Sequence, residues 1–138
     1  MDEMLRRCAS RRVVMVHGLA ARQEDVWAAL DTFEPQVVVH GSGRGADGYA
    51  DQWARRNRVA RLWLDPRSKG YDPAALARHG AVMLRMLDTL ADRGATVALI
   101  AFGHDAATDE LVRRARGLNI PVVERGRVAV PGSIIARL

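Results

Sequence analysis

Apolar and polar residues alternate along the chain in blocks that predict strands and helices in turn. Short runs rich in valine, isoleucine and leucine are typical of buried strands, whereas apolar residues three or four positions apart are typical of amphipathic helices. The predicted strands cover residues 13–17, 36–40, 60–64 and 96–102, with a fifth opening at 121–123 and a short edge strand at 127–130. The predicted helices begin at residue 23, at 46 (ending near 57), and at 73 (ending near 93), and a last one ends near 117.

This alternation predicts a single α/β domain. Strands joined by helices in this way form a mainly parallel sheet with right-handed crossovers and helices on both faces. We therefore expect a Rossmann-like three-layer sandwich with a mainly parallel, five-stranded sheet in residues 13–138, preceded by a basic leader at 1–12. The run 96–102 is the most apolar, so we expect it to be a central strand that is covered on both faces.

Length and composition narrow the class of protein. A chain of 138 residues with 49% hydrophobic and 27% charged residues fits one globular domain. No apolar run approaches the roughly 18 residues that a membrane span needs, so we expect no membrane partner. Cys8 is the only cysteine, which excludes an intramolecular disulfide and fits the reducing cytoplasm. We therefore expect a cytoplasmic protein.

The net charge of +5 comes largely from arginine, and two arginine clusters occupy 55–61 and 113–116. A basic chain is one signature of nucleic-acid binding. Both clusters, however, fall near predicted helix ends, where cations complement the helix dipole, and few aromatic residues lie between them. We favour the structural interpretation and keep nucleic acid as an alternative partner.

Three glycines on alternate positions, Gly41, Gly43 and Gly45, follow the second strand directly and precede a helix. A turn of this kind exposes backbone N–H groups at a helix N-terminus, which attracts anions such as phosphate. In a parallel sheet, loops at the carboxyl ends of the strands lie together. We therefore expect 18–22, 41–46 and 103–108 to converge on one ligand site.

Histidines follow the same strand ends. His17, His40 and His104 are candidates for ligand contact or proton transfer, and for His17 and His40 a structural role at the strand end is the alternative. No set of residues has the spacing of metal ligands, so we predict no metal site.

Several segments of the chain resemble those of a known protein family. Residues 39–47 (VHGSGRGAD), followed by Ala50, Trp53 and Ala54, resemble the signature of the YspA-like branch of the SLOG superfamily, Rossmann-like proteins that bind nucleotide derivatives. The resemblance continues at 26–31, at 101–102 with 108–115, and at 120–122. It implies a nucleotide-derived ligand and a homodimer. Ile134, Ile135 and Leu138 would then cover either a partner subunit or the domain's own core.

The chain departs from the family pattern at three places. Gly18-Leu19-Ala20 stands where the family has Gly-Ser-Arg, and His79-Gly80 stands where it has Arg-Asn. The second glycine-rich loop is reduced to 103–108, where Asp105 places negative charge at the expected phosphate position. We therefore expect this second loop to have an altered ligand or none.

The phosphoribohydrolases of the superfamily carry Thr-x-x-Glu after that loop, and here the fourth position is Leu111. Glu110 lies one position away, about 100° around the helix, and cannot simply replace the missing carboxylate. His104, Asp105 and Glu110 are the remaining candidates for catalytic acid or base. For Glu110 and Asp109 we favour the alternative role of acids at the start of a helix.

Our main hypothesis is a protein that binds or senses a nucleotide or an ADP-ribose-like small molecule, with no cofactor predicted beyond that ligand. Arg44 would pair with the phosphate, and Asp47 would steady the turn or meet a ribose hydroxyl. The alternatives are hydrolysis of a nucleotide and DNA binding as in the DNA-processing relatives. The predicted ligand-binding residues are Gly18, His40, Gly41, Ser42, Gly43, Arg44, Gly45, Asp47, Gly103, His104 and Thr108.

Overall fold

The structure, a computed structural model, describes residues 10–41, 45–63 and 73–125, and residues 73–77 only as backbone. Strands and helices alternate through these ranges. The strands are β1 (Arg12–His17), β2 (Val37–His40), β3 (Ala60–Trp63), β4 (Thr96–Phe102) and β5 (Val122–Arg125). The helices are α2 (Gln23–Phe33), α3 (Ala46–Arg56), α4 (Pro73–Asp92) and α5 (Ala106–Gly117). The predicted edge strand at 127–130, Asp72 before α4 and the apolar residues of the tail lie outside the described residues.

The five strands form one sheet in the order β3-β2-β1-β4-β5, and every neighbouring pair is parallel. This confirms the predicted fold class. The chain builds outward from β1 through β2 to β3, then returns to place β4 on the other side of β1. The strand order therefore reverses between β1 and β4, where open α/β sheets bind their ligands.

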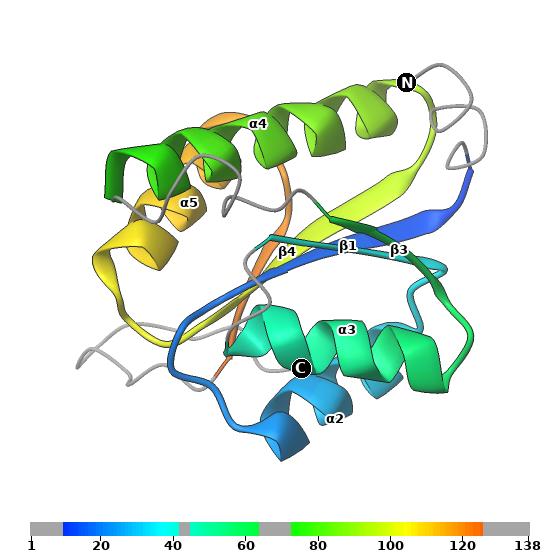
Figure 1. The fold of residues 1–138 in the computed structure, drawn as a ribbon. Helices are drawn as coiled ribbons and strands as arrows, with labels where there is room; N and C mark the ends of the chain where they lie inside the picture. Colours follow the sequence, from blue (N-terminus) through cyan, green and yellow to red (C-terminus); the bar gives the residue numbers. More distant parts are fainter. Residues whose placement is uncertain (1–9, 42–44, 64–72, 126–138) are drawn as a thin grey trace, which may run out of the picture.

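Helices cover both faces of the sheet, α4 and α5 on one and α2 and α3 on the other (Figure 1). Successive strand residues point to opposite faces, so Val13 faces the α4–α5 side and Val14 the α2–α3 side. Leu99 and Ile100 of β4 divide in the same way. The expectation that β4 is covered on both faces is confirmed, although the middle of the sheet belongs to β1.

Two tryptophans hold α2 against α3. The indole N–H of Trp27 donates to the carbonyl oxygen of Tyr49 at 2.9 Å, and that of Trp53 donates to the carboxylate of Asp31, also at 2.9 Å. The helices thereby satisfy the polar atoms of two large side chains, of which Trp53 is buried and Trp27 is partly buried. Helix α3 begins at Ala46, shortly after β2 ends at His40.

None of the described helices is long and apolar enough to cross a membrane.

Candidate functional site

The loops after β1, β2 and β4 meet at the carboxyl ends of the strands, as predicted. The N–H of Ala46, the first residue of α3, donates to the carbonyl oxygen of Gly18 at 2.8 Å. On the other side, the N–H of Leu19 lies 3.4 Å from a carboxylate oxygen of Asp105. The loop after β1 is therefore held between the other two.

Glycine is required at Gly45 by this close approach. Its φ is +54°, and a Cβ there would lie 2.5 Å from the carbonyl oxygens of both Gly18 and Leu19. A Cβ on Gly18 would lie 2.2 Å from the carbonyl oxygen of Phe102. Gly45 was interpreted from the sequence as one of the glycines that expose amides to a ligand, whereas the described contacts require glycine there, as at Gly18, for packing between loops.

Asp47 closes the β2–α3 turn from the inside. Its side chain is only 2% exposed, and one carboxylate oxygen accepts the N–H of Gly41 at 2.6 Å. The predicted site residues Ser42, Gly43 and Arg44 lie outside the described residues. The amides of Gly41 and Ala46 already have acceptors within the protein, which corrects the picture of a turn with all its N–H groups bare.

His40 ends β2 and is buried, with 3% of its surface exposed. Its Nε2 lies 2.8 Å from Asp51 of α3, and the same carboxylate binds Arg61 at 2.7 Å and Arg55 at 2.9 Å. Burial alone would raise the pKa of Asp51, but hydrogen bonds from Arg61 and His40, together with their charges, hold it below its ordinary value. Nδ1 of His40 is buried and has no hydrogen-bond partner among the described residues.

His17, at the end of β1, belongs to a hydrogen-bonded chain with Thr108 and Asp105. The hydroxyl of Thr108 donates to Asp105 at 2.8 Å and lies 2.9 Å from Nδ1 of His17. Because the hydroxyl proton points to the carboxylate, Nδ1 of His17 is the donor to the hydroxyl oxygen. Thr108 is completely buried, so its predicted contact with ligand is not available in this conformation.

Asp105 is the N-cap of α5. One carboxylate oxygen accepts the N–H of Thr108 at 2.9 Å, and the other accepts the Thr108 hydroxyl. Burial alone would raise the pKa of Asp105, but the hydrogen bonds from Thr108 and Leu19 and the nearby His17 lower it below its ordinary value. The carboxylate therefore lies where the start of α5 would otherwise attract an anion.

The other residues suggested for catalysis are also engaged in the fold. Glu110 pairs with Arg113 and, at 2.8 Å, with Arg114, and these hydrogen bonds, the one from Arg113 first, lower its pKa. Nδ1 of the half-exposed His104 lies 3.6 Å from Asp109. Leu111 is buried in the core. Each carboxylate among these candidates therefore has a partner within the protein.

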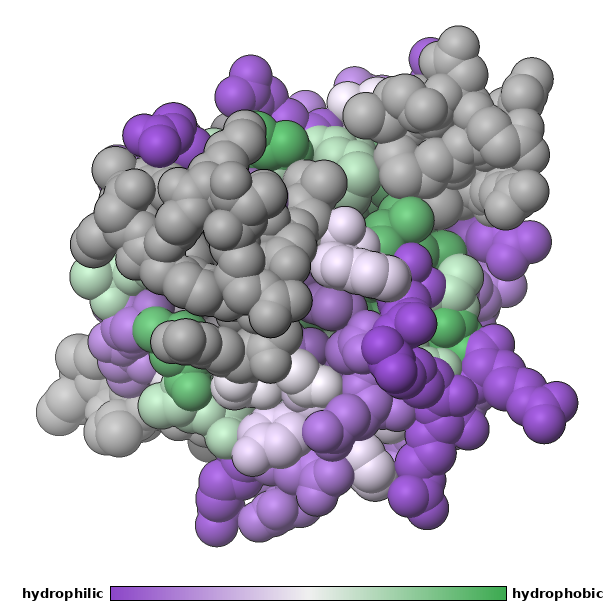
Figure 2. All heavy atoms as spheres, viewed as in Figure 1, coloured by the Kyte–Doolittle hydropathy of each residue, from purple (hydrophilic) through white to green (hydrophobic). Residues whose placement is uncertain are grey.

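The arginine clusters are largely paired within the protein. Arg55 and Arg61 bind Asp51, and Arg116 binds Glu124 at 3.0 Å. The guanidinium of Arg56 lies 5.3 Å from the ring centre of Trp27. Hydrophilic side chains gather over α3 in the lower part of the view in Figure 2. These contacts favour the structural interpretation of the basic residues.

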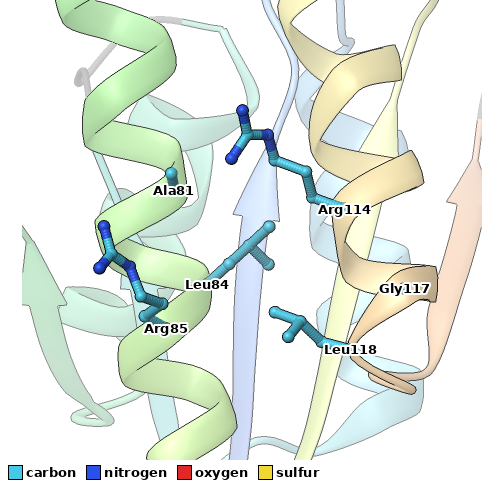
Figure 3. Close-up of a pocket in the computed structure, with 6 residues that line it drawn as sticks. All are labelled: Ala81, Leu84, Arg85, Arg114, Gly117 and Leu118. Atoms are coloured by element: carbon cyan, nitrogen blue, oxygen red, sulfur yellow. The ribbon is translucent and has the colours of Figure 1, made fainter.

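A groove of about 300 Å³ lies away from the three loops, between α4 and α5. Leu84 and Leu118 point toward one another across it, with Arg85 and Arg114 at its rim (Figure 3). The end of α5 that lines this groove leads into β5, so it lies at the opposite end of the strands from the candidate site.

Among the described residues, no cluster of three or more His, Cys, Asp or Glu side chains is placed to hold a metal ion.

Sequence reasoning missed Asp51 and Trp63 as parts of the site. The register pairs Trp63 of β3 with His40 of β2, and the two rings are parallel within 4° with centres 6.1 Å apart. Strand order decides that pairing, and a sequence pattern does not show which strands are neighbours.

Comparison with models of known protein families gives no match, and comparison with curated proteins gives none either.

Proposed function

We propose that this chain binds a phosphorylated, nucleotide-like small molecule at the β2–α3 turn, as a binding or sensing protein of the SLOG type. The observation that carries the proposal is the way the turn is held. Asp47 fixes its first amide from inside, and the backbone of Gly18 and Leu19 packs against Gly45 at its end. Both described ends of the turn are therefore held, and helix α3 begins directly after it, where a helix N-terminus attracts anions.

The buried position of Asp47 favours one of its two predicted roles. Its exposure of only 2% and its hydrogen bond to Gly41 support a role in steadying the turn over contact with a ribose hydroxyl. Arg44 is then the proposed side-chain partner of the phosphate, because a guanidinium can make two hydrogen bonds to it. The resemblance of residues 39–47 to the SLOG signature supports the same ligand class.

The contacts of the candidate acids and bases favour binding over hydrolysis. Asp105 caps a helix, Glu110 is paired with two arginines, and Leu111 replaces the carboxylate that the phosphoribohydrolases use. Incubation with nucleoside monophosphates should therefore release no free base above the level of a Glu110→Gln control. Turnover above that control would favour the hydrolase.

The paired arginines likewise disfavour nucleic acid as the ligand. Each phosphate neutralised on duplex DNA contributes about −0.9 to the slope of log affinity against log salt. Since several arginines of both clusters already bind carboxylates, we expect little affinity for DNA and a shallow slope. A mobility shift that weakens steeply with salt would contradict this expectation.

Calorimetric titration with AMP, ADP-ribose, ribose 5-phosphate and inorganic phosphate tests the proposal. At least one phosphorylated ligand should bind and raise the melting temperature, and Arg44→Ala should weaken that binding by about 10-fold or more, because a hydrogen bond to a charged group is lost. Arg93→Ala is the matched control, since Arg93 precedes β4 at the opposite end of the sheet. Binding of none of these ligands, or unchanged affinity in Arg44→Ala, would overturn the proposal.

A further inference from the structure

Trp63 lies exposed beside the β2–α3 turn. It is the last described residue of β3, and 51% of its surface is accessible. Among the described residues, the other exposed large hydrophobic side chains are Leu19, Val82 and Leu118, and none of them is aromatic. Trp63 is therefore an accessible aromatic ring next to the candidate site, with an apolar body and a polar N–H.

Its position relative to the turn follows from the register of the sheet. Trp63 pairs with His40, and Gly41 follows His40 directly. Neighbouring strands are about 4.8 Å apart, so Trp63 lies one strand spacing from His40, the residue that precedes the turn. Because β3 is the edge strand of the described sheet, no strand lies on the outer side of Trp63.

The indole is held in place by its neighbours. The imidazole of His40 is parallel to it within 4°, and the guanidinium carbon of Arg61 lies 5.0 Å from its ring centre. Asp51 binds both of these neighbours, His40 at 2.8 Å and Arg61 at 2.7 Å. One carboxylate on α3 therefore orients the two groups that support Trp63. The ring is positioned in advance while half of its surface stays in contact with solvent.

We propose that Trp63 is a stacking surface for the base of the ligand whose phosphate lies in the β2–α3 turn. This inference rests on the proposed function and narrows it, because it requires an aromatic base and not only a sugar phosphate. Stacking on an aromatic side chain is tolerant of base identity, since every base has a π face. The surface thus provides affinity for nucleotides as a class.

The test compares nucleoside monophosphates with ribose 5-phosphate, which has the same phosphate and sugar but no base. We expect the best of AMP, GMP, CMP and UMP to bind wild type about 5- to 150-fold more tightly than ribose 5-phosphate, as one stacked base allows. Trp63→Ala should remove this difference and leave the affinity for ribose 5-phosphate unchanged. Trp63→Phe should retain most of it, and Trp27→Phe on α2 is the matched control.

The outcomes separate this inference from the proposed function. If ribose 5-phosphate binds and no base increases the affinity, or if Trp63→Ala leaves the difference intact, the stacking surface is disproved and the phosphate site stands. If neither nucleotides nor ribose 5-phosphate bind, the proposed function fails and the inference fails with it. If Trp63→Ala instead converts a dimer to a monomer in sedimentation without changing nucleotide affinity, Trp63 is an interface residue and the stacking surface is disproved.

Discussion

Gly80 of α4 lies against Leu111 of α5, so closely that a Cβ on Gly80 would stand 3.0–3.2 Å from the Leu111 side chain. In the SLOG pattern that the sequence resembles, the corresponding positions hold asparagine and, in the hydrolases, glutamate. Here the two positions form an apolar contact between two helices, and neither supplies a polar side chain.

Leu111→Glu tests this interpretation. The substitution introduces the residue that the SLOG hydrolases have, and it places a carboxylate in a buried, apolar position against α4. We expect it to lower the free energy of unfolding by about 3 kcal/mol or more, because leucine packing is lost and a charge is buried without a partner. Urea unfolding measures this loss, with Leu118→Glu at a more exposed position as the control. A loss below about 1 kcal/mol would show that position 111 accepts a carboxylate.

Asp105→Ala should reveal the contribution of the α5 cap and its dependence on pH. At pH 7 we expect a loss of about 1–2 kcal/mol, as is typical when an N-cap carboxylate is removed, and a smaller loss in Asp105→Asn. The pKa of Asp105 is lowered in the folded state, so its stabilising effect is complete above the ordinary carboxyl pKa of about 3.9 and is lost as the pH falls through the lower folded value.

Urea unfolding of wild type and Asp105→Ala between about pH 7 and pH 3 measures this effect. The difference in stability between the two proteins should be constant near neutral pH and shrink below about pH 4. A difference that grows on acidification would contradict the depressed pKa.

Gly45→Ala should be strongly destabilising, whereas Gly117→Ala should not. At Gly45 the backbone has φ +54° and ψ −130°, a conformation that costs a residue with a side chain about 1–3 kcal/mol, and the clash with the Gly18 and Leu19 carbonyls adds to that cost. At Gly117, the last residue of α5, a Cβ meets nothing within 4 Å, so alanine should be neutral or stabilise by up to about 1 kcal/mol. Thermal unfolding of the two variants provides the comparison, and equal effects would refute the loop packing described above.

Asp51→Ala should destabilise the protein and change the emission of Trp63. Removing this carboxylate leaves Nε2 of His40 without its partner in a buried position and releases Arg61, for a loss of about 1–3 kcal/mol. Glu24→Ala is the control, because its pair with Arg22 is exposed and should contribute less than about 1 kcal/mol. The emission of Trp63 is obtained as the difference between two spectra, one of the protein with Trp63 and one of the same protein carrying Trp63→Phe. This difference is measured for wild type and for Asp51→Ala. An unchanged signal would mean that Asp51 does not orient the groups around Trp63.

The alternation of apolar runs was sufficient to predict the fold. Residues 96–102 were expected as a strand and form β4 with those bounds, because a long apolar run between a Gly94 turn and Gly103 permits little else. The start of α2 at residue 23 and the end of α5 at residue 117 were also predicted. Local propensities and turn residues are sufficient to predict an element's bounds where those bounds depend on residues only a few positions away.

The candidate site was predictable only in outline. Strand ends and glycines indicated which loops converge, since topology places them together. The contacts that decide the chemistry join residues far apart in sequence, such as His40 with Trp63 or Leu19 with Asp105. Those contacts depend on strand order and on the positions of helices relative to the sheet, and no local pattern encodes either. For Asp105 the sequence showed a negative charge in the loop after β4, but it did not show the contact of that charge with Leu19.

The cap on α5 has a consequence for the kind of molecule that this chain would accept. A ligand that brings a second negative group to the start of α5 would have to displace the carboxylate of Asp105. Because this carboxylate is part of the chain, it is always present at that position. A molecule with a single anionic end avoids that competition. We therefore expect selectivity by charge count, in which mononucleotides are preferred over pyrophosphates such as ADP-ribose.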